Sequence, residues 1–141
     1  AGFRELGDAK VLLERAGEDA PESAALDLVG DIDRDREHHH NLYVIELDPD
    51  VLKVRRFRAA NPDRDPDRPC VYVGMTGLTP EERLENHRRG HKSSWFPKTF
   101  GKRLLPELYA AFNPMPYELA SLMEGELAEH LRSLGHGVWW N

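Results

Sequence analysis

The chain has 141 residues, a formal net charge of −6 at pH 7 and a charged fraction of 31%. This length suits one domain with its own hydrophobic core, and the acidic balance argues against a protein whose whole surface grips nucleic acid. The single cysteine, Cys70, excludes an intramolecular disulfide and gives no zinc-ligand spacing. No apolar run approaches the length of a membrane span and no signal peptide is visible, so we expect a cytoplasmic protein without a membrane partner.

The first 40 residues predict an acidic helical extension of the main domain. They contain eleven acidic and five basic side chains. Apolar residues fall at helical spacing over residues 3–16, and Pro21 opens a second short helix that continues to about Val29. This extension is expected to cover the domain and not to carry catalysis.

The stretch from Asp31 to His40 is polar and charged, and it is expected to be a loop. Its last residues, His38, His39 and His40, raise the question of a metal site. Consecutive residues of an extended chain point to alternating sides, so at most two of these histidines can share one ion. No carboxylate or cysteine lies at a recognisable ligand spacing, and an exposed loop is therefore the expectation.

Two strands are predicted in the middle of the chain, with a long segment between them. Residues 42–47 and 70–75 are rich in aliphatic, β-branched and aromatic side chains. Between them, residues 51–58 fit helical spacing, and a strand is the competing interpretation. The segment 48–69 is therefore expected to be an insertion between two strands that still pair.

A well-marked helix start follows the second strand. Thr79 is a good N-cap, Pro80 suits the first helical position, and Glu82 completes a capping box. The predicted helix runs from Pro80 to about Arg89 and ends at Gly90.

This helix start fixes the position of two polar side chains relative to the strand. Arg83 and His87 are four residues apart and hence lie on one helical face. On the preceding strand, Gly74 marks a point where something must come close to the backbone. Tyr72 on the same strand, together with the Arg83/His87 pair, would form a phosphate site.

A local basic patch lies beside this motif. Residues 81–103 hold three acidic side chains and seven basic ones, namely Arg83, Arg88, Arg89, Lys92, Lys98, Lys102 and Arg103. Trp95, Phe96 and Phe100 are interleaved with them, which suits phosphate neutralisation combined with base stacking. The alternatives are an ordinary solvated surface and aromatic side chains that anchor a loop on the core.

The end of the chain predicts a long helix over residues 117–134. Its apolar stripe consists of Ala120, Met123, Leu127, Leu131 and Leu134. Glu124 lies at the edge of this stripe, where a carboxylate costs free energy unless it meets a cation or hydrogen-bond donors. Residues 104–112 fit a short helix or an edge strand, and residues 138–141 fit a final strand or a packing tail.

These motifs together resemble the GIY-YIG nucleases. Leu42-Tyr43-Val44 resembles the first family motif, Tyr72-Val73-Gly74 the second, and the helix residues Arg83 and His87 follow in order. With Glu124 on the later helix, the resemblance covers about Asn41 to Asn141. It implies an α+β fold with a small antiparallel sheet of about three strands flanked by helices. The domains would be a helical extension (1–40) and a nuclease domain (41–141).

The resemblance also implies roles for individual side chains. Tyr43 is similar to the family's general base, with Tyr72 and His87 as the next candidates, and Glu124 is similar to its metal-binding glutamate. Arg83 is similar to the arginine that contacts the scissile phosphate. Asn141 is comparable with a late asparagine, although its distance from Glu124 is longer than expected. Other expected substrate contacts are Gly74, Arg88, Arg89, Lys92, Lys98, Lys102 and Arg103.

Two positions depart from the family pattern. Asn41 stands where the first motif has glycine, and Met75 stands where many members have lysine. The gap between the two motifs is also far longer than the usual tight connection.

The chemistry that follows is phosphodiester hydrolysis. Mg²⁺, or Mn²⁺ in its place, keeps several waters and often takes only one or two protein carboxylates, so one glutamate is sufficient. We therefore expect a metal-dependent endonuclease that acts on DNA rather than RNA. The alternative is a catalytically inactive module of the same fold that binds nucleic acid or serves as a regulatory interaction domain. Targeting would come from a homo-oligomer, a partner or the insertion.

Overall fold

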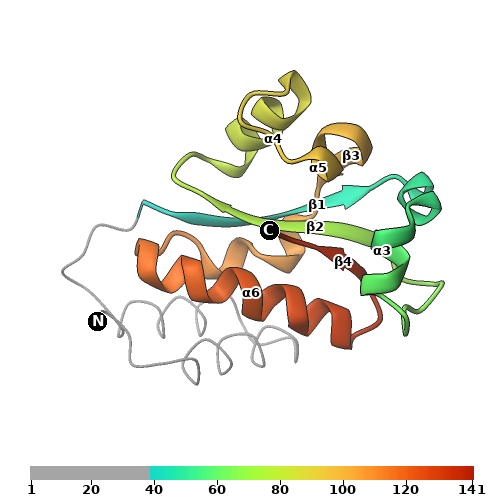
Figure 1. Cartoon of the computed structure of the whole chain (residues 1–141). Helices are drawn as coiled ribbons and strands as arrows, with labels where there is room; N and C mark the ends of the chain where they lie inside the picture. Colours follow the sequence, from blue (N-terminus) through green and yellow to red (C-terminus); the bar gives the residue numbers. More distant parts are fainter. Residues whose placement is uncertain (1–38) are drawn as a thin grey trace.

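The computed structural model describes residues 39–141 (Figure 1). The two helices predicted for residues 3–29 and most of the expected loop before His40 lie outside the described residues. The strands are β1 (Asn41–Leu47), β2 (Cys70–Thr76), β3 (Gly101–Leu104) and β4 (Gly137–Trp139). The helices are α3 (Arg55–Ala60), α4 (Pro80–Arg89), α5 (Trp95–Phe100) and α6 (Tyr117–Ser133), with 3₁₀ turns η1 (Pro49–Lys53), η2 (Pro106–Leu108) and η3 (Ala110–Phe112).

The centre of the fold is a mixed four-stranded sheet with strand order β3-β1-β2-β4. β1 pairs with β2 and with β3 in antiparallel fashion, whereas β4 runs parallel to β2. The expected antiparallel pairing holds for β1, β2 and β3, but the expectation of about three strands, all antiparallel, was wrong because a fourth strand, β4, runs parallel to β2. β4 has only three residues, too few to show an alternating pattern in the sequence. Its parallel direction follows from the long crossover that includes α6.

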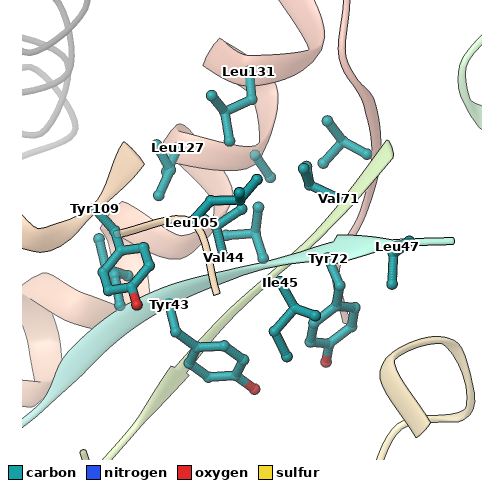
Figure 2. Packing of buried hydrophobic residues seen from close by; sticks show 14 of the residues in the cluster. Tyr43, Val44, Ile45, Leu47, Val71, Tyr72, Leu105, Tyr109, Leu127 and Leu131 are labelled. Atoms are coloured by element: carbon teal, nitrogen blue, oxygen red, sulfur yellow. The ribbon is translucent and has the colours of Figure 1, made fainter. Parts of the chain in front are cut away.

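The β1–β2 register places the two motif tyrosines on one face of the sheet. Tyr43 lies opposite Gly74, and Ile45 lies opposite Tyr72, so the two tyrosines are diagonal neighbours. Figure 2 shows both hydroxyls on the side of the sheet away from Leu127 and Leu131.

Helices cover both faces of the sheet and produce three layers. α6 packs under one face, and α4 and α5 lie over the other (Figure 1). Ala120, Met123, Leu127 and Leu131 are buried, which confirms most of the apolar stripe expected for α6. Leu134 is the exception because the helix ends at Ser133, and its side chain is 42% exposed.

The segment 48–69 is helical in its first half, as preferred from the sequence, but Val54 in extended conformation divides it into η1 and α3. One buried side chain connects this segment to β4. The Nδ2 of Asn61 donates to the carbonyls of Phe57 and Val138, and its Oδ1 accepts from the Val138 amide and from Nε of Arg132. Hydrogen bonds of Asn61 therefore connect residues 48–69 to the last strand.

The segment 104–112 contains both of the alternatives that its sequence left open. Leu104 ends β3, an edge strand, and two 3₁₀ turns follow it. The tail forms strand β4, one of the two alternatives expected for it. Within residues 39–141, no helix has the length and apolarity that crossing a membrane requires.

Candidate functional site

The site begins with the packing of Tyr43 against Gly74. Both residues are buried, and a Cβ atom built on Gly74 would overlap the ring and hydroxyl of Tyr43. The group expected to come close to the backbone at Gly74 is thus the Tyr43 side chain. Gly74 lets the Tyr43 ring lie flat across β2, with its hydroxyl directed toward α4.

The start of α4 places the next two side chains. Thr79 accepts a hydrogen bond from the Glu82 amide, and the Glu82 carboxylate accepts one from the Thr79 amide, which confirms the capping box. The helix ends at Gly90 in left-handed conformation. Arg83 and His87 then face the sheet, and His87 is fully buried.

His87 connects Tyr43 to the loop after α4. Its Nε2 lies 2.9 Å from the Tyr43 hydroxyl, and its Nδ1 lies 3.2 Å from Oγ of Ser93. The Ser93 hydroxyl donates its proton to the carbonyl of Ser94, so toward His87 it can only accept. With the Ser93 proton on that carbonyl, His87 Nδ1 carries a proton toward Ser93, and the lone pair of Nε2 accepts from Tyr43.

The electrostatics of this pair favour the neutral forms of both groups. Burial, with the added effect of the positive Arg83, lowers the pKa of His87 to about 4. Burial, with the nearby Tyr72, raises the pKa of Tyr43 far above its ordinary value, although Arg83 acts in the opposite direction. At neutral pH the structure thus holds a protonated tyrosine against an unprotonated imidazole nitrogen.

Tyr72 completes a cluster of three rings. The ring centroids of Tyr43, Tyr72 and His87 lie 5.7 to 6.2 Å from one another. The Tyr72 hydroxyl accepts from Nδ2 of Asn141 at 3.1 Å and hydrogen bonds with Ser94. Burial raises the pKa of Tyr72 above its ordinary value.

Arg83 lies where its charge acts on all three rings. Its guanidinium donates to the backbone carbonyls of Lys92 at 2.8 Å and His91 at 3.3 Å, and it also hydrogen bonds with Tyr43. These carbonyls fix the guanidinium in position. The residue is half-buried, so its positive charge is only partly screened by water.

Glu124 belongs to α6, which covers the other face of the sheet, and it acts on the cluster through its charge. β4 pairs with β2 only over Cys70–Tyr72, and the backbone of Met75, beyond this pairing, hydrogen bonds with the Glu124 carboxyl. Burial raises the pKa of this carboxyl to about 7, and the Met75 hydrogen bond acts against that shift. The negative charge of Glu124 in turn raises the pKa of Tyr43 and Tyr72, so the acid lies within electrostatic reach of both rings.

Near the cluster, Glu124 supplies one carboxylate that could serve as a cation ligand. In residues 39–141, no group of three or more His, Cys, Asp or Glu side chains could hold a metal ion. Within the same residues, no lysine or arginine forms an ion pair with the half-buried Glu124. A single carboxylate leaves most of the coordination of a divalent cation to water and substrate oxygens, which Mg²⁺ tolerates.

The expected basic contacts are partly engaged within the chain. Arg103 forms an ion pair with Glu46 at 2.7 Å, and Arg88 donates to the Lys102 carbonyl at 2.8 Å. Arg89 donates to Oδ1 of Asn86. The exposed side chains of Lys92, Lys98 and Lys102 lie in the same segment of the chain.

Ser93 and Ser94 were not predicted as site residues. Ser94 is the N-cap residue of α5, and serine before a helix is a recognisable signal. Nothing in the pattern distinguishes Ser93, because its role depends on a turn that brings residue 93 back beside residue 87. The third histidine of the 38–40 run, His40, packs edge-on against Tyr117, with ring centroids 5.1 Å apart.

A scan against protein-family models found no match to this chain, and neither a search of curated proteins nor a search of solved structures found a similar protein. The function therefore has to be inferred from the geometry of the site itself.

Proposed function

We propose that this chain is a metal-dependent endonuclease that hydrolyses phosphodiester bonds in DNA, with the GIY-YIG-like site that the sequence resemblance implies. One observation carries the proposal. Tyr43, Tyr72, Arg83 and His87 come from three different elements and form one cluster, and the charge of Glu124, on a fourth element, acts on both tyrosines. A purely structural role would not require a tyrosine pair, a guanidinium and a half-buried acid together.

The first step is the activation of water by Tyr43. The Tyr43 oxygen takes a proton from the attacking water while its own proton moves to Nε2 of His87, which is 2.9 Å away. The oxygen of the water forms the new bond to phosphorus while the bond from phosphorus to one sugar oxygen breaks, and that sugar oxygen leaves and takes a proton from solvent. This relay needs no standing tyrosinate, which burial of Tyr43 makes unfavourable.

Arg83 and Glu124 act on the phosphate. The guanidinium lies beside Tyr43 and is suited to sharing charge with the pentacoordinate phosphorus, because its planar fork donates two hydrogen bonds at once. Glu124 is the side chain that would hold Mg²⁺ or Mn²⁺. Such an ion, when bound, supplies charge neutralisation and stabilises the leaving oxygen.

A plasmid-nicking assay with and without Mg²⁺ tests the proposal. Wild type is expected to nick the plasmid only with Mg²⁺, and Glu124→Gln is expected to lose activity by at least about a hundredfold. Glu129→Gln on the exposed side of the same helix is the matched control and should retain activity.

Undiminished nicking by Glu124→Gln would remove the metal role of this acid. DNA binding at low salt without any cleavage would instead support the inactive nucleic-acid-binding module, because phosphate contacts are strongest under that condition.

A further inference from the structure

A second surface lies beside the candidate site and contains an exposed tryptophan. Trp95 begins α5 and is 47% exposed, whereas large aromatic side chains are on average mostly buried. The rings of Phe96 and Phe100 meet it edge-on, with centroids 5.1 and 5.4 Å away. These contacts fix the indole in place while much of its surface faces solvent.

Arg56 adds a positive charge to this aromatic cluster. Its guanidinium carbon lies 5.0 Å from the ring centroid of Trp95, 4.9 Å from that of Phe96 and 5.9 Å from that of Trp139. A planar guanidinium against aromatic rings is positioned and weakly hydrated, a state suited to phosphate binding.

The surroundings of this surface are basic. α3, with sequence RRFRAA, contributes Arg55 and Arg58 beside Arg56 and contains no acid. α5 contributes Lys98 and also contains no acid. An anionic partner is therefore favoured here, although the chain as a whole is acidic.

The surface is continuous with the candidate site. Trp95 directly follows Ser94, which hydrogen bonds with Tyr72. Trp139 lies opposite Tyr72 in the β2–β4 register, and its ring centroid is 4.6 Å from that of Phe96. A strand whose phosphate reached the Tyr72 hydroxyl would carry its next nucleotides toward Trp95.

We propose that Trp95 and Arg56 form a stacking site for an unpaired nucleobase adjacent to the phosphate that is cleaved. The inference rests on the proposed function for its substrate class and adds a preference within it. Bases inside a duplex are covered on both faces by their neighbours, so only an unpaired base can offer its face to the indole. The preferred substrate is then a single strand, or a duplex locally opened beside the cleavage site.

The test compares DNA strands that have the same charge with and without bases. Binding of a fluorescent oligo(dT), an abasic strand of equal length and a duplex is measured by anisotropy, with Glu124→Gln used to prevent cleavage. Oligo(dT) is expected to bind about tenfold or more tightly than the abasic strand, because stacking contributes ~1–3 kcal/mol per base. Trp95→Ala should abolish this difference and leave abasic-strand binding unchanged. Trp95→Phe should retain most of it.

Arg55→Ala is the matched control, since it removes a neighbouring charge without touching the rings, and it should weaken both strands equally. Equal binding of oligo(dT) and the abasic strand by the parent protein would overturn the inference. So would an equal loss for both strands in Trp95→Ala, with thermal unfolding measured to confirm that the variant is folded.

The outcomes also separate this inference from the proposed function. If nicking depends on Glu124 but oligo(dT) and the abasic strand bind equally well, the stacking site is rejected and the proposed function stands. If oligo(dT) binds more tightly than the abasic strand but no plasmid is nicked, the nuclease function is rejected and the stacking site stands. Absence of binding to all three probes at low salt overturns both.

Discussion

The Tyr43 hydroxyl lies 2.9 Å from Nε2 of His87, and this contact joins β1 to α4 across 44 positions of the chain. Because Ser93 determines which nitrogen of His87 is protonated, the contact has a direction: the tyrosine donates and the histidine accepts. The Tyr72 hydroxyl instead receives a hydrogen bond from Asn141 and also hydrogen bonds with Ser94 and Tyr43.

The two tyrosines should therefore differ in their effect on activity. Tyr43→Phe removes the proposed relay and is expected to lower kcat by ~10²–10⁴-fold, the usual contribution of a general base. Tyr72→Phe removes only a hydroxyl that has other partners, and it should cost less. Single-turnover cleavage of a plasmid substrate measures both, and equal losses would contradict the assignment of Tyr43 as the base.

Ser93→Ala should act on catalysis through the tautomer of His87. Without the hydroxyl acceptor, Nδ1 no longer holds its proton preferentially, and the Nε2-protonated form cannot accept from Tyr43. We expect kcat to fall about tenfold with KM little changed, because the removed hydrogen bond is worth ~1 kcal/mol. Ser93→Thr should restore activity. The ¹⁵N chemical shifts of His87 report the tautomer directly, and an unaltered tautomer in Ser93→Ala would refute the role.

Gly74→Ala should destabilise the fold because the added methyl group overlaps the Tyr43 ring. Overpacking of this kind costs ~1–3 kcal/mol, and displacement of the ring should also reduce activity. Gly125→Ala is a control with the opposite sign. It lies inside α6, where its Cβ would be 3.9 Å from Nε1 of Trp140, so it should stabilise the protein by ~0.5–1 kcal/mol. Urea unfolding curves measure both.

The proposed nuclease activity should rise with pH through about 7, where the half-buried Glu124 carboxyl loses its proton. His87 has a pKa of about 4 and stays neutral over this range, so it does not produce the same limb. A bound cation favours the deprotonated carboxylate. A higher Mg²⁺ concentration should therefore shift the rise in activity to lower pH. Profiles of kcat/KM against pH at two Mg²⁺ concentrations check this expectation. A rise in kcat/KM whose midpoint pH is the same at both concentrations would contradict it.

Without metal, the same carboxyl should make the fold less stable as pH rises. Its pKa is raised from 4.5 in the unfolded chain to about 7, so its contribution is fully present below pH 4.5 and is lost as pH passes through 7. The free energy of unfolding of wild type should fall relative to Glu124→Gln by ~1–2 kcal/mol between pH 5 and pH 8, after allowance for partial solvent screening. The lowered pKa of His87 makes the free energy of unfolding rise with pH, but it does so equally in wild type and Glu124→Gln. A constant difference between them would show that the carboxyl is not desolvated.

Much of the framework was predictable because it depends on local signals. The capping box at Thr79, the glycine under Tyr43 and the apolar stripe of α6 each follow from residue types at fixed spacing. These signals place Arg83, His87 and Glu124 on the correct faces of their helices. The resemblance to a nuclease family then suggested which side chains to look for.

The parts that were wrong or missed depend on tertiary contacts. β4 is three residues long, and its pairing with β2 depends on the path of the chain after α6. Ser93 becomes important only because a left-handed Gly90 turns the chain back toward His87. The cation–π cluster around Arg56 joins α3, α5 and β4, and no spacing in the sequence indicates that these segments meet.

The amide of Asn61 has a consequence for anyone who wishes to engineer this scaffold. Residues 48–69 look dispensable, since two strands that pair over their full length could be joined by a short hairpin. Excising them would delete the side chain that satisfies both the amide and the carbonyl of Val138. The last strand would lose its hydrogen bonds to Asn61, and Asn141, which follows that strand, would lose its hydrogen bond to the Tyr72 hydroxyl. A shortened version of the domain should therefore retain Asn61 or replace its hydrogen bonds to the backbone of Val138.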